Sequence, residues 1–496
     1  MKLNMKISDS MKRLICFAVS VAAMLATMVS CCETKVDSSV PHKIKNGRII
    51  LETPQRAAGQ ISALELTCDP IETVRVGFIG LGMRGPDAVR RFTYIDGTQI
   101  IALCDLEEDR VAKAQEILSE KGLPEAVSYC GDSAWKALCE RDDIDLVYIC
   151  TPWQCHVEMA VYAMEHGKHV AVEVPAAMSI AECWQLVDTS ERTRKHCMML
   201  ENCVYDFFEM TALNMAQHGL FGEILHVEGA YIHNLDPYWE AYHDNWRLAY
   251  NQAHRGDVYP THGIGPVCQV LNIHRGDRMD YLVSQDTKSV QGKAAAEKIM
   301  GTDEFANGDH TVTLIRTANG KQIEIQHNVY TRRPYNRMYQ LCGVDGFACK
   351  YPVEGIALKT ENLSDDGVND YQNLDGESFV DASTFAELME KYRHPITAEY
   401  EAKAKQVGGH GGMDYIMDSR LVYCLRNGLP LDQDVYDAAE WSCLTELSGL
   451  SIAYGSMPVE VPDFTRGDWN RIKGYRHHVK PNMKIFDKNS PKSDIK

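Results

Sequence analysis

The sequence has little positive charge, no paired-cysteine motif and only a short apolar run at its N-terminus. It carries 51 Lys and Arg against 69 Asp and Glu, and no basic cluster offsets the net charge of −18. Such a chain repels the phosphates of a nucleic acid, so we expect no nucleic-acid partner. None of the 17 cysteines stands in a CxxC pair, which favours buried free thiols over a zinc site. We therefore predict that the protein binds no metal.

The N-terminal apolar run, Leu14–Val29, is shorter than the ~20 residues that cross a bilayer as a helix. Lys12 and Arg13 precede this run and Ser30-Cys31 follow it, which is the arrangement of a secretory signal. The end of the run resembles a bacterial lipobox, with Cys31 as the lipidated first residue of the mature chain. We predict an exported lipoprotein of the periplasm or outer membrane, held to the membrane only through Cys31. Plain cleavage to a soluble periplasmic protein is the alternative.

A chain of 496 residues is too long for one compact core, so we expect two domains with additional segments. The predicted organisation is a lipoprotein signal peptide over 1–31, a tether over 32–72, a dinucleotide-binding Rossmann domain over 73–203, a substrate-binding α/β domain over 204–465 and a C-terminal tail over 466–496.

Residues 73–105 have the pattern of a dinucleotide-binding unit. A β-rich run over 73–80 ends on glycine, and the segment Gly80-Leu81-Gly82-Met83-Arg84-Gly85 then leads into a helical pattern. The first glycine permits a tight turn, the second lets the backbone approach a pyrophosphate, and the third lets the helix pack on the strand. A second strand over 99–104 ends at Asp105, twenty residues after Gly85, where a carboxylate binds ribose hydroxyls. The pattern predicts NAD as the cofactor.

The alternation of strands and helices continues to residue 201. Strands over 144–150, 169–173 and 197–201 are separated by helical patterns over 109–121, 133–140, 156–166 and 180–195. This alternation predicts a doubly wound parallel sheet, with ligands beyond the carboxyl ends of its strands. Three segments then share one rim with the glycine loop, namely 151–156, 173–174 and 201–202.

The pattern changes after Gly222 to strands over 223–231, 310–316, 321–330 and 338–343, with a turn at 318–320 that fits antiparallel pairing. Residues 231–262 are rich in aromatic side chains, whose ring faces and polar edges suit sugars. Arg247 and the proline- and glycine-bounded turn over 259–263 bring titratable groups together in this region. The run over 408–412, Gly-Gly-His-Gly-Gly, opens a predicted helix over 413–426 and makes His410 a secondary site candidate.

The segments GLGMRG, CD, TPxxxH, GKHVAVEVP and ENCVYD follow one another in an order that resembles the Gfo/Idh/MocA oxidoreductases. The resemblance covers nearly the whole mature chain and implies a Rossmann domain joined to an open antiparallel sheet. Dehydrogenases of that family carry a proton-transfer lysine in Glu-Lys-Pro, whereas this chain has Glu173-Val174-Pro175. Valine has no titratable proton, which argues against an ordinary sugar dehydrogenase mechanism. A family histidine that lies against the cofactor corresponds to His262, although Val258 stands where the family has an acid.

The combination of GLGMRG, EVP, ENCxY, GxYIHxL, YPTHGxGP, RRPY and GGHGGMDY resembles glycoside hydrolase family 109, NAD-dependent exo-glycosidases that act on α-linked N-acetylgalactosamine. Together with the glycine loop, this resemblance assigns cofactor binding to Gly80, Gly82, Met83, Arg84, Gly85, Asp105, Trp153, Gln154, Cys155, His156, Glu173, Val174 and Asn202. It assigns sugar binding to Tyr231, Arg247, Tyr259, Pro260, Thr261, His262 and Tyr335, and we predict His262 and Tyr259 as the catalytic residues.

Direct displacement of a glycoside needs two placed carboxylates, and the sequence shows no such pair. We therefore expect oxidation at C3 of the sugar by NAD, loss of the C2 proton, elimination at C1, addition of water and final reduction. The expected partner is a terminal N-acetylgalactosamine glycan or related saccharide, and a homo-oligomer is left open. Two alternatives also stay open: an NAD-dependent sugar oxidoreductase with net turnover of NAD, and a non-catalytic carbohydrate-binding lipoprotein.

Overall fold

The computed structural model describes residues 40–359 and 374–479. The predicted signal over 1–31, the lipidated Cys31 and the predicted tail beyond residue 479 lie outside the described residues. Export and lipidation therefore stay predictions. Within the described ranges, no helix combines the length and the hydropathy that crossing a membrane requires.

The first half of the described chain forms a six-stranded parallel sheet in the order β5-β4-β3-β6-β7-β8. Its strands are β3 (Val74–Ile79), β4 (Thr98–Asp105), β5 (Val127–Cys130), β6 (Leu146–Ile149), β7 (His169–Val172) and β8 (Cys197–Met199). The intervening helices are α2 (Gly85–Phe92), α3 (Glu108–Glu120), α4 (Ala134–Cys139), α5 (His156–Glu165) and α6 (Ile180–Thr193). The predicted Rossmann fold is confirmed, and its strand order reverses between β3 and β6, where such sheets bind their ligands.

Strands β3 and β6 form the centre of this sheet, and their side chains are almost entirely buried. Phe78 of β3 and Tyr148 of β6 lie with ring centroids 5.1 Å apart, and Phe92 of α2 packs edge-on against both rings. Continuous apolar runs of this kind are what a parallel strand needs when helices cover its sheet. This packing fixes the carboxyl end of β3, from which the glycine loop starts.

The second half is built on a ten-stranded sheet in the order β1-β2-β16-β10-β11-β12-β9-β13-β14-β15. Most neighbours are antiparallel, and the exceptions are the parallel pairs β12–β9 and β16–β2. The strands are β1 (His42–Lys45), β2 (Arg48–Leu51), β9 (Ile224–Ile232), β10 (Met279–Asp286), β11 (Thr311–Thr317), β12 (Gln322–Asn328), β13 (Asn336–Gly343), β14 (Gly346–Cys349), β15 (Gly355–Leu358) and β16 (Val459–Glu460). The predicted open, mainly antiparallel sheet is confirmed, and the turn at 318–320 joins β11 to β12 as expected.

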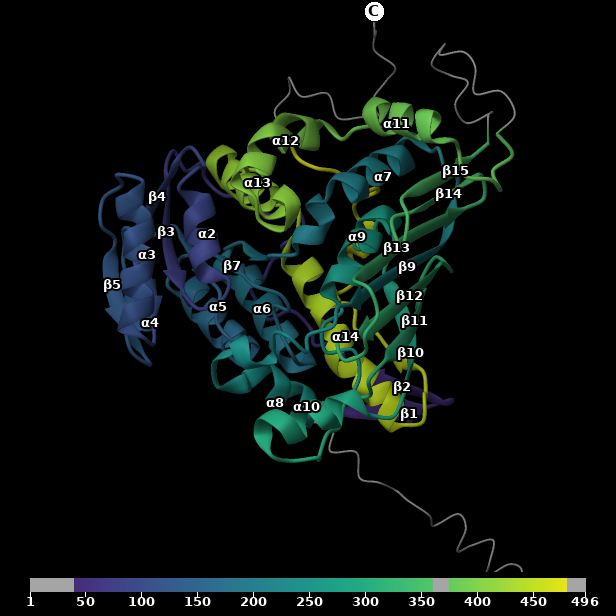
Figure 1. The fold of residues 1–496 in the computed structure, drawn as a ribbon, viewed down its shortest axis with the longest axis horizontal. Coiled ribbons are helices and arrows are strands. Elements are labelled where there is room, and N and C mark those ends of the chain that lie inside the picture. Colours follow the sequence, from purple (N-terminus) through teal and green to yellow (C-terminus); the bar gives the residue numbers. More distant parts are fainter. Residues whose placement is uncertain (1–39, 360–373, 480–496) are drawn as a thin grey trace, which may run out of the picture. The chain divides into compact units, whose positions relative to one another are not determined.

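Helix α14 (Val435–Ala453) joins the two halves (Figure 1). It packs against α6 and β8 on the Rossmann side and against β10 of the large sheet. Asp434 caps its first turn by accepting hydrogen bonds from the main chain of Tyr436 and Asp437. Trp441 is among the largest fully buried side chains of the described residues. Helix α14 thus lies inside the core, between the two halves.

Two segments are more ordered than the sequence indicated. Residues 42–51, within the predicted tether, form the hairpin β1–β2, which joins the large sheet through β16. Its strands have only four residues each, too few for a periodic signal. Residues 466–479 were predicted as a tail, but Tyr475 and His477 are buried and Arg466 pairs with Glu191. Contacts with distant parts of the chain, and not local pattern, hold both segments.

The remaining helices are α7 (Phe207–His218), α8 (Trp246–Ala253), α9 (Thr261–Leu271), α10 (Gln291–Met300), α11 (Ala382–Lys391), α12 (Pro395–Val407) and α13 (Met413–Asn427), with short 3-10 helices that include η1 (Trp153–Cys155), η2 (Asn202–Tyr205) and η6 (His410–Gly412). Helix α13 matches its prediction. The expected turn over 259–263 is wrong in part, because α9 begins at Thr261 and places His262 in its first turn. Pro260 stands at the N-cap, where a proline is tolerated because that position needs no main-chain donor.

Candidate active site

The glycine loop between β3 and α2 has the geometry that its sequence predicts. Gly80 has φ of +90°, and a Cβ there would lie 2.7 Å from the main chain of Cys150. A Cβ on Gly85 would lie 2.1 Å from the carbonyl oxygen of Gly80, so only glycine lets α2 pack this closely. At Gly82 a Cβ would meet only Arg110 Nη1, at 3.8 Å, which leaves the main chain open to a ligand. No side chain caps the start of α2, so its first main-chain N–H groups are free to bind a pyrophosphate.

Asp105, at the end of β4, holds this loop in place. One carboxylate oxygen accepts a 2.6 Å hydrogen bond from the main chain of Leu81, and the other accepts from Glu107 and from Arg110 Nη1. Asp105 thus joins the glycine loop to the second strand, and its predicted bond to the ribose remains a prediction. Met83 and Arg84 are partly exposed beside the loop, with Arg84 Nε 3.8 Å from Glu173 Oε1.

The segments that follow β6 and β7 form an aromatic and apolar part of the predicted cofactor rim. Trp153 is buried and donates from Nε1 to the main-chain oxygen of Val174, itself a buried side chain. Gln154 is exposed and Cys155 partly exposed. His156 is fully buried, and its two ring nitrogens contact the carbonyl oxygens of Pro175 and Thr151. Its ring therefore shapes the rim and has no nitrogen left for the cofactor.

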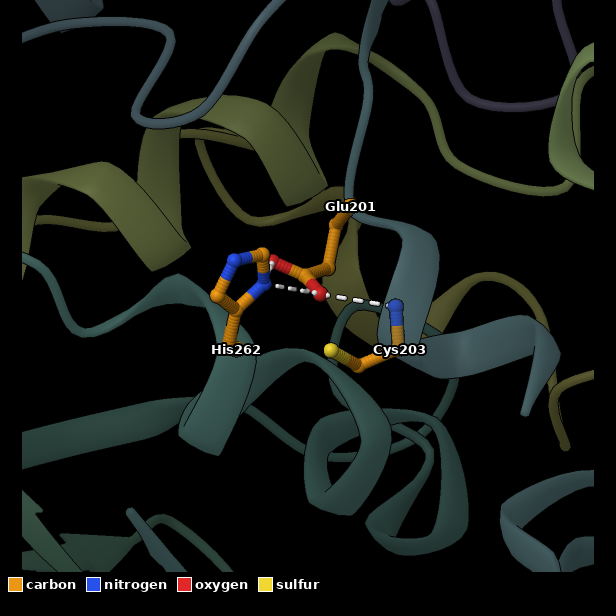
Figure 2. Close-up of side chains that lie close together, drawn as sticks. All are labelled: Glu201, Cys203 and His262. Carbon is orange, nitrogen blue, oxygen red and sulfur yellow. Dashed lines mark hydrogen bonds and ion pairs between the residues drawn. The ribbon is translucent and has the colours of Figure 1, made fainter. Parts of the chain in front are cut away.

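Glu201, His262 and Tyr259 form a continuous hydrogen-bonded chain, of which Figure 2 shows the contact between Glu201 and His262. Nδ1 of His262 lies 2.8 Å and 2.9 Å from the two carboxylate oxygens of Glu201, and Nε2 lies 3.2 Å from the Tyr259 hydroxyl. Glu201 is fully buried. Burial alone would raise its pKa, but the positive charge that His262 carries when protonated, the hydrogen bond from His262 and the main-chain N–H of Cys203 outweigh burial and hold that pKa below its ordinary value. An ionised Glu201 accepts from Nδ1–H, which leaves Nε2 to accept from Tyr259.

Glycines in α9 make this chain of contacts sterically feasible. A Cβ on Gly263 would lie 2.6 Å from the main chain of Ala230 in β9, and a Cβ on Gly265 would lie 2.8 Å from Glu201 Cγ. Helix α9 therefore approaches both the large sheet and the end of β8 more closely than any other residue would allow. The short spacing of glycines after His262 thus places the imidazole against Glu201.

Arg247 of α8 lies in a cage of aromatic rings. Its guanidinium carbon is 4.4 Å from the Tyr259 ring centroid, 5.0 Å from Trp153 and 5.3 Å from Tyr242. Nη1 donates a 2.7 Å hydrogen bond to the Tyr242 hydroxyl. Only 7% of Arg247 is exposed, so its rotamer is fixed and its remaining donors have a set direction. Trp153 also stacks on Tyr259 with centroids 5.4 Å apart, which links the cofactor rim to this cage.

The other predicted sugar residues lie around the same centre, with one exception. The Tyr231 ring meets Tyr259 at 4.7 Å, and its hydroxyl is 3.0 Å from His233 Nδ1. Tyr335 is 43% exposed and packs edge-on against His233. Thr261 is the exception, because its side chain is fully buried with Oγ1 unpartnered inside the protein. The structure thus gives no support to a sugar contact through that hydroxyl.

Comparisons with known proteins decide the family. The sequence model described as "Glycosyl hydrolase 109, C-terminal domain" matches residues 205–471, and the one described as "Oxidoreductase family, NAD-binding Rossmann fold" matches residues 74–201. Glycosyl hydrolase family 109 protein 1 of Bacteroides thetaiotaomicron is 63% identical over 438 residues, which cover 88% of this chain and 94% of that protein. The chain belongs to glycoside hydrolase family 109. Its Rossmann domain binds NAD, as predicted.

Solved structures resemble this family 109 chain in fold. An oxidoreductase domain protein from Kribbella flavida has a TM-score of 0.60 at 19% identity, over 79% of this chain and 100% of that one. An oxidoreductase from Agrobacterium radiobacter, solved with NAD⁺, L-tartaric acid and magnesium, has a TM-score of 0.56 at 16% identity, over 78% and 98%. At these identities the likeness concerns the fold alone, and it confirms a Rossmann domain joined to a large sheet.

The sequence did not assign a role to two residues of the family 109 site, Glu201 and His233. Glu201 follows β8 and was placed on the rim, but its partner His262 is 61 residues further along the chain. No local pattern connects them. His233 lies two residues after Tyr231, so both project from the same side of the strand end. That spacing is the signal by which His233 could have been found.

Glu201, Cys203 and His262 also have potential metal-ligand atoms within 4.8 Å of one another. Two contacts argue against a bound metal ion at this group. The guanidinium Nη1 of Arg337 lies 3.0 Å from Cys203 Sγ, where it would repel a cation. The Glu201 carboxylate already accepts from His262 and from the main chain of Cys203. The second such group, His274 with Asp434 and Asp437, is likewise paired with a cation, Arg275.

Proposed function

We propose that this family 109 enzyme releases terminal α-linked N-acetylgalactosamine by a sequence of oxidation, elimination, addition of water and reduction in which NAD is restored. The observation that carries the proposal is the Glu201–His262–Tyr259 chain, which sits beside the NAD-binding rim through the stacking of Trp153 on Tyr259. A buried carboxylate, an imidazole and a phenol in series form a proton-transfer device, and not the paired carboxylates of direct displacement.

Bound NAD supplies reversible oxidation at C3 of the sugar, which acidifies the hydrogen at C2. The protein then has to accept that proton. Tyr259 and His262 share one hydrogen bond, so a proton that arrives at either group can pass to Nε2 of His262. Since Nδ1 already donates to ionised Glu201, the resulting imidazolium faces a buried negative charge that stabilises it.

Tyr259 serves as the protonated member of the pair. Burial raises the pKa of Tyr259 well above its ordinary value, and the charge of Arg247 only partly opposes this. The phenol therefore stays protonated when no sugar proton is in transit, and it can donate to the departing C1 oxygen. Arg247, fixed by its aromatic cage, orients sugar hydroxyls with its remaining donors. Tyr231 and Tyr335 provide ring surface for the sugar.

The decisive experiment uses the purified protein with an α-N-acetylgalactosaminide in D₂O. We expect release of N-acetylgalactosamine that carries deuterium at C2, with no added NAD and no net change in nicotinamide absorbance. An oxidised sugar with a requirement for added NAD would identify a sugar oxidoreductase instead. Binding of the sugar without turnover would identify a carbohydrate-binding protein. Cleavage with the C2 hydrogen fully retained would leave the family assignment intact but refute the proposed chemistry.

Export as a lipoprotein remains part of the proposal. It rests on the sequence of residues 12–32 and fits an enzyme that restores its own NAD, because no supply of free nicotinamide is then required. Metabolic labelling of the expressed protein with a fatty acid tests it, and a Cys31→Ala variant should lose the label.

A further inference from the structure

The segment that leads into Tyr259 is held against α14 by two close glycine contacts. A Cβ on Gly256 would lie 2.6 Å from the main-chain nitrogen of Gly449, and a Cβ on Gly449 would lie 2.4 Å from the carbonyl oxygen of Arg255. Gly256 also has φ of +113°, which glycine adopts without strain. The main chain before Tyr259 therefore touches α14 directly, and its position depends on that helix.

Uncharged polar groups fix the same segment from two sides. Ser448 Oγ of α14 accepts a 2.8 Å hydrogen bond from the main chain of Asp257. On the other side, Asn307 Oδ1 accepts a 3.1 Å hydrogen bond from the main chain of Gly256, and Asn307 Nδ2 donates to Asn251 Oδ1. Asn251 lies in α8, the helix of the aromatic cage. The segment is thus connected both to α14 and to the helix that supplies the site guanidinium.

The carboxyl group of Asp257 is enclosed by these contacts. The residue is 2% exposed, and its Oδ1 accepts a 3.1 Å hydrogen bond from the main chain of Tyr259. Its Oδ2 is buried and has no hydrogen-bond partner. Within residues 40–359 and 374–479, no hydrogen bond or ion pair joins this carboxyl to a charged side chain, and the neighbouring Arg255 is engaged with Asp286. An ionised Asp257 would be a buried charge without a counter-ion, which costs far more than the neutral acid.

We propose that Asp257 is a positioning residue for Tyr259 and that it acts as the neutral acid. Its Oδ1 fixes the main chain from which the phenol projects, and the phenol thereby keeps its 3.2 Å contact with His262 Nε2. Ionisation leaves an unpaired charge beneath the segment, and water reaches that charge only when the segment separates from α14. Tyr259 then leaves its place beside His262.

This change falls close to neutral pH. Burial raises the pKa of Asp257 to about 7, and only the hydrogen bond from the main chain of Tyr259 opposes burial. The folded state with Tyr259 in place is therefore favoured below this pH and lost above it. The effect on turnover rests on the proposed function, whereas the protonation of Asp257 can be measured without any sugar.

The pH dependence of kcat for an α-N-acetylgalactosaminide tests the proposal. We expect wild-type kcat to fall about tenfold for each pH unit above about 7, because the neutral fraction of Asp257 falls by that factor. Asp257→Asn keeps the shape and the Oδ1 acceptor but cannot ionise. It should match the wild type within about twofold at about pH 6 and lack the alkaline fall. Asp303→Asn, at an exposed acid four residues before Asn307, is the matched control and should keep the wild-type profile.

Two further variants separate the hydrogen bond from the charge. Asp257→Ala removes the acceptor for the main chain of Tyr259 and should lower kcat about tenfold at about pH 6, with KM nearly unchanged. Ser448→Ala loosens the same segment but leaves the carboxyl in place. It should lower kcat about threefold and retain the alkaline fall.

Two sugar-free measurements keep this inference distinct from the proposed function. The infrared difference spectrum between the wild type and Asp257→Asn should contain a protonated carboxyl band at about pH 6 that is lost above about pH 8. Near-ultraviolet circular dichroism, which reports the stacking of Trp153 on Tyr259, should change over the same range only when Asp257 is present. If the wild type turns over no α-N-acetylgalactosaminide, the proposed function fails and these two titrations still decide the state of Asp257. The inference is overturned if Asp257→Asn keeps the alkaline fall, or if the carboxyl band is absent at about pH 6.

Discussion

Two buried networks flank the short helix η2 and use their charges differently. The reactive network consists of Glu201, His262 and Tyr259, with one carboxylate and two groups that share a proton. The structural network consists of Asp206, Glu209, Arg337 and Lys350, in which both carboxylates contact both cations. They meet at Cys203, whose sulfur accepts a hydrogen bond from Arg337.

The difference between the networks concerns what a proton can do. When both carboxylates of the structural network are ionised, the positive and negative charges are equal in number, so a proton that then arrives leaves an uncompensated positive charge. In the reactive network the charge of Glu201 is compensated only when His262 takes up a proton. Paired charges thus hold the structural network in one arrangement, whereas the unpaired charge of Glu201 lets the reactive network take up a proton during catalysis.

Removing the imidazole should give the largest effect. We expect His262→Ala to lower kcat by about 10³-fold, because the group that receives the sugar proton is gone. The imidazole is only 13% exposed and pairs with the fully buried Glu201, so the unfolding midpoint should also fall, because that carboxylate loses its partner. Steady-state kinetics and thermal unfolding on the same preparation test both statements. Near-wild-type turnover would show that the network of Glu201, His262 and Tyr259 does not transfer the catalytic proton.

Breaking the structural network should instead affect folding. Arg337→Met leaves Asp206 and Glu209 with Lys350 as their shared cation. We expect a loss of about 3 kcal/mol in the free energy of unfolding, because a buried charge loses its partner. Denaturant unfolding measures it, with Arg192→Met in an exposed ion pair as the matched control. Unchanged stability would show that the network does not hold the fold.

Removing the charge of Glu201 while keeping its shape should give an intermediate effect. Glu201→Gln still accepts a hydrogen bond from His262 Nδ1 but cannot stabilise the imidazolium. We expect kcat to fall by about 10²-fold, with substrate binding nearly unchanged. Measured kcat and KM separate the two quantities. A rise in KM alone would mean that Glu201 only shapes the pocket.

The smallest effect concerns pH. Burial and the neighbouring Asp206 raise the pKa of Glu209 from its ordinary 4.5 to about 7, against the opposing charges of Lys350 and Arg337. The folded state therefore holds this proton more tightly than the unfolded state, and stability should fall as pH rises from about 4.5 to 7. Glu209→Gln should flatten the pH dependence of unfolding across that window, while Glu223→Gln, an exposed acid, should not.

The Rossmann half could be predicted from the sequence because its signals are local. The strand, the glycines, the helix and Asp105 lie within 32 residues, and each constrains the next. The site in the second half depends on contacts across long separations. His262 meets Glu201, and the parallel pairing of β12 with β9 joins segments that no hairpin connects.

The region of α9 shows why the local signal was misleading. Pro260, Gly263, Gly265 and Pro266 are typical of a turn. The helix forms because its glycines pack against β9 and Glu201, and that tertiary contact outweighs the low helix propensity of these residues. His156 shows the limit of such a signal in another way, since its place on the rim is as expected but its ring nitrogens contact the main chain of the protein itself.

The burial of α14 has a consequence for engineering. Nearly every side chain of this helix is covered, by the Rossmann elements on one flank and by the large sheet on another. A fragment that ended at residue 203 would lack α14, which covers part of its core. In the complementary fragment, the face of α14 that packs against the Rossmann elements would be exposed to water. Neither half can be transplanted as an autonomous module, so a chimera with altered sugar selectivity has to exchange loops around the site and keep the scaffold whole.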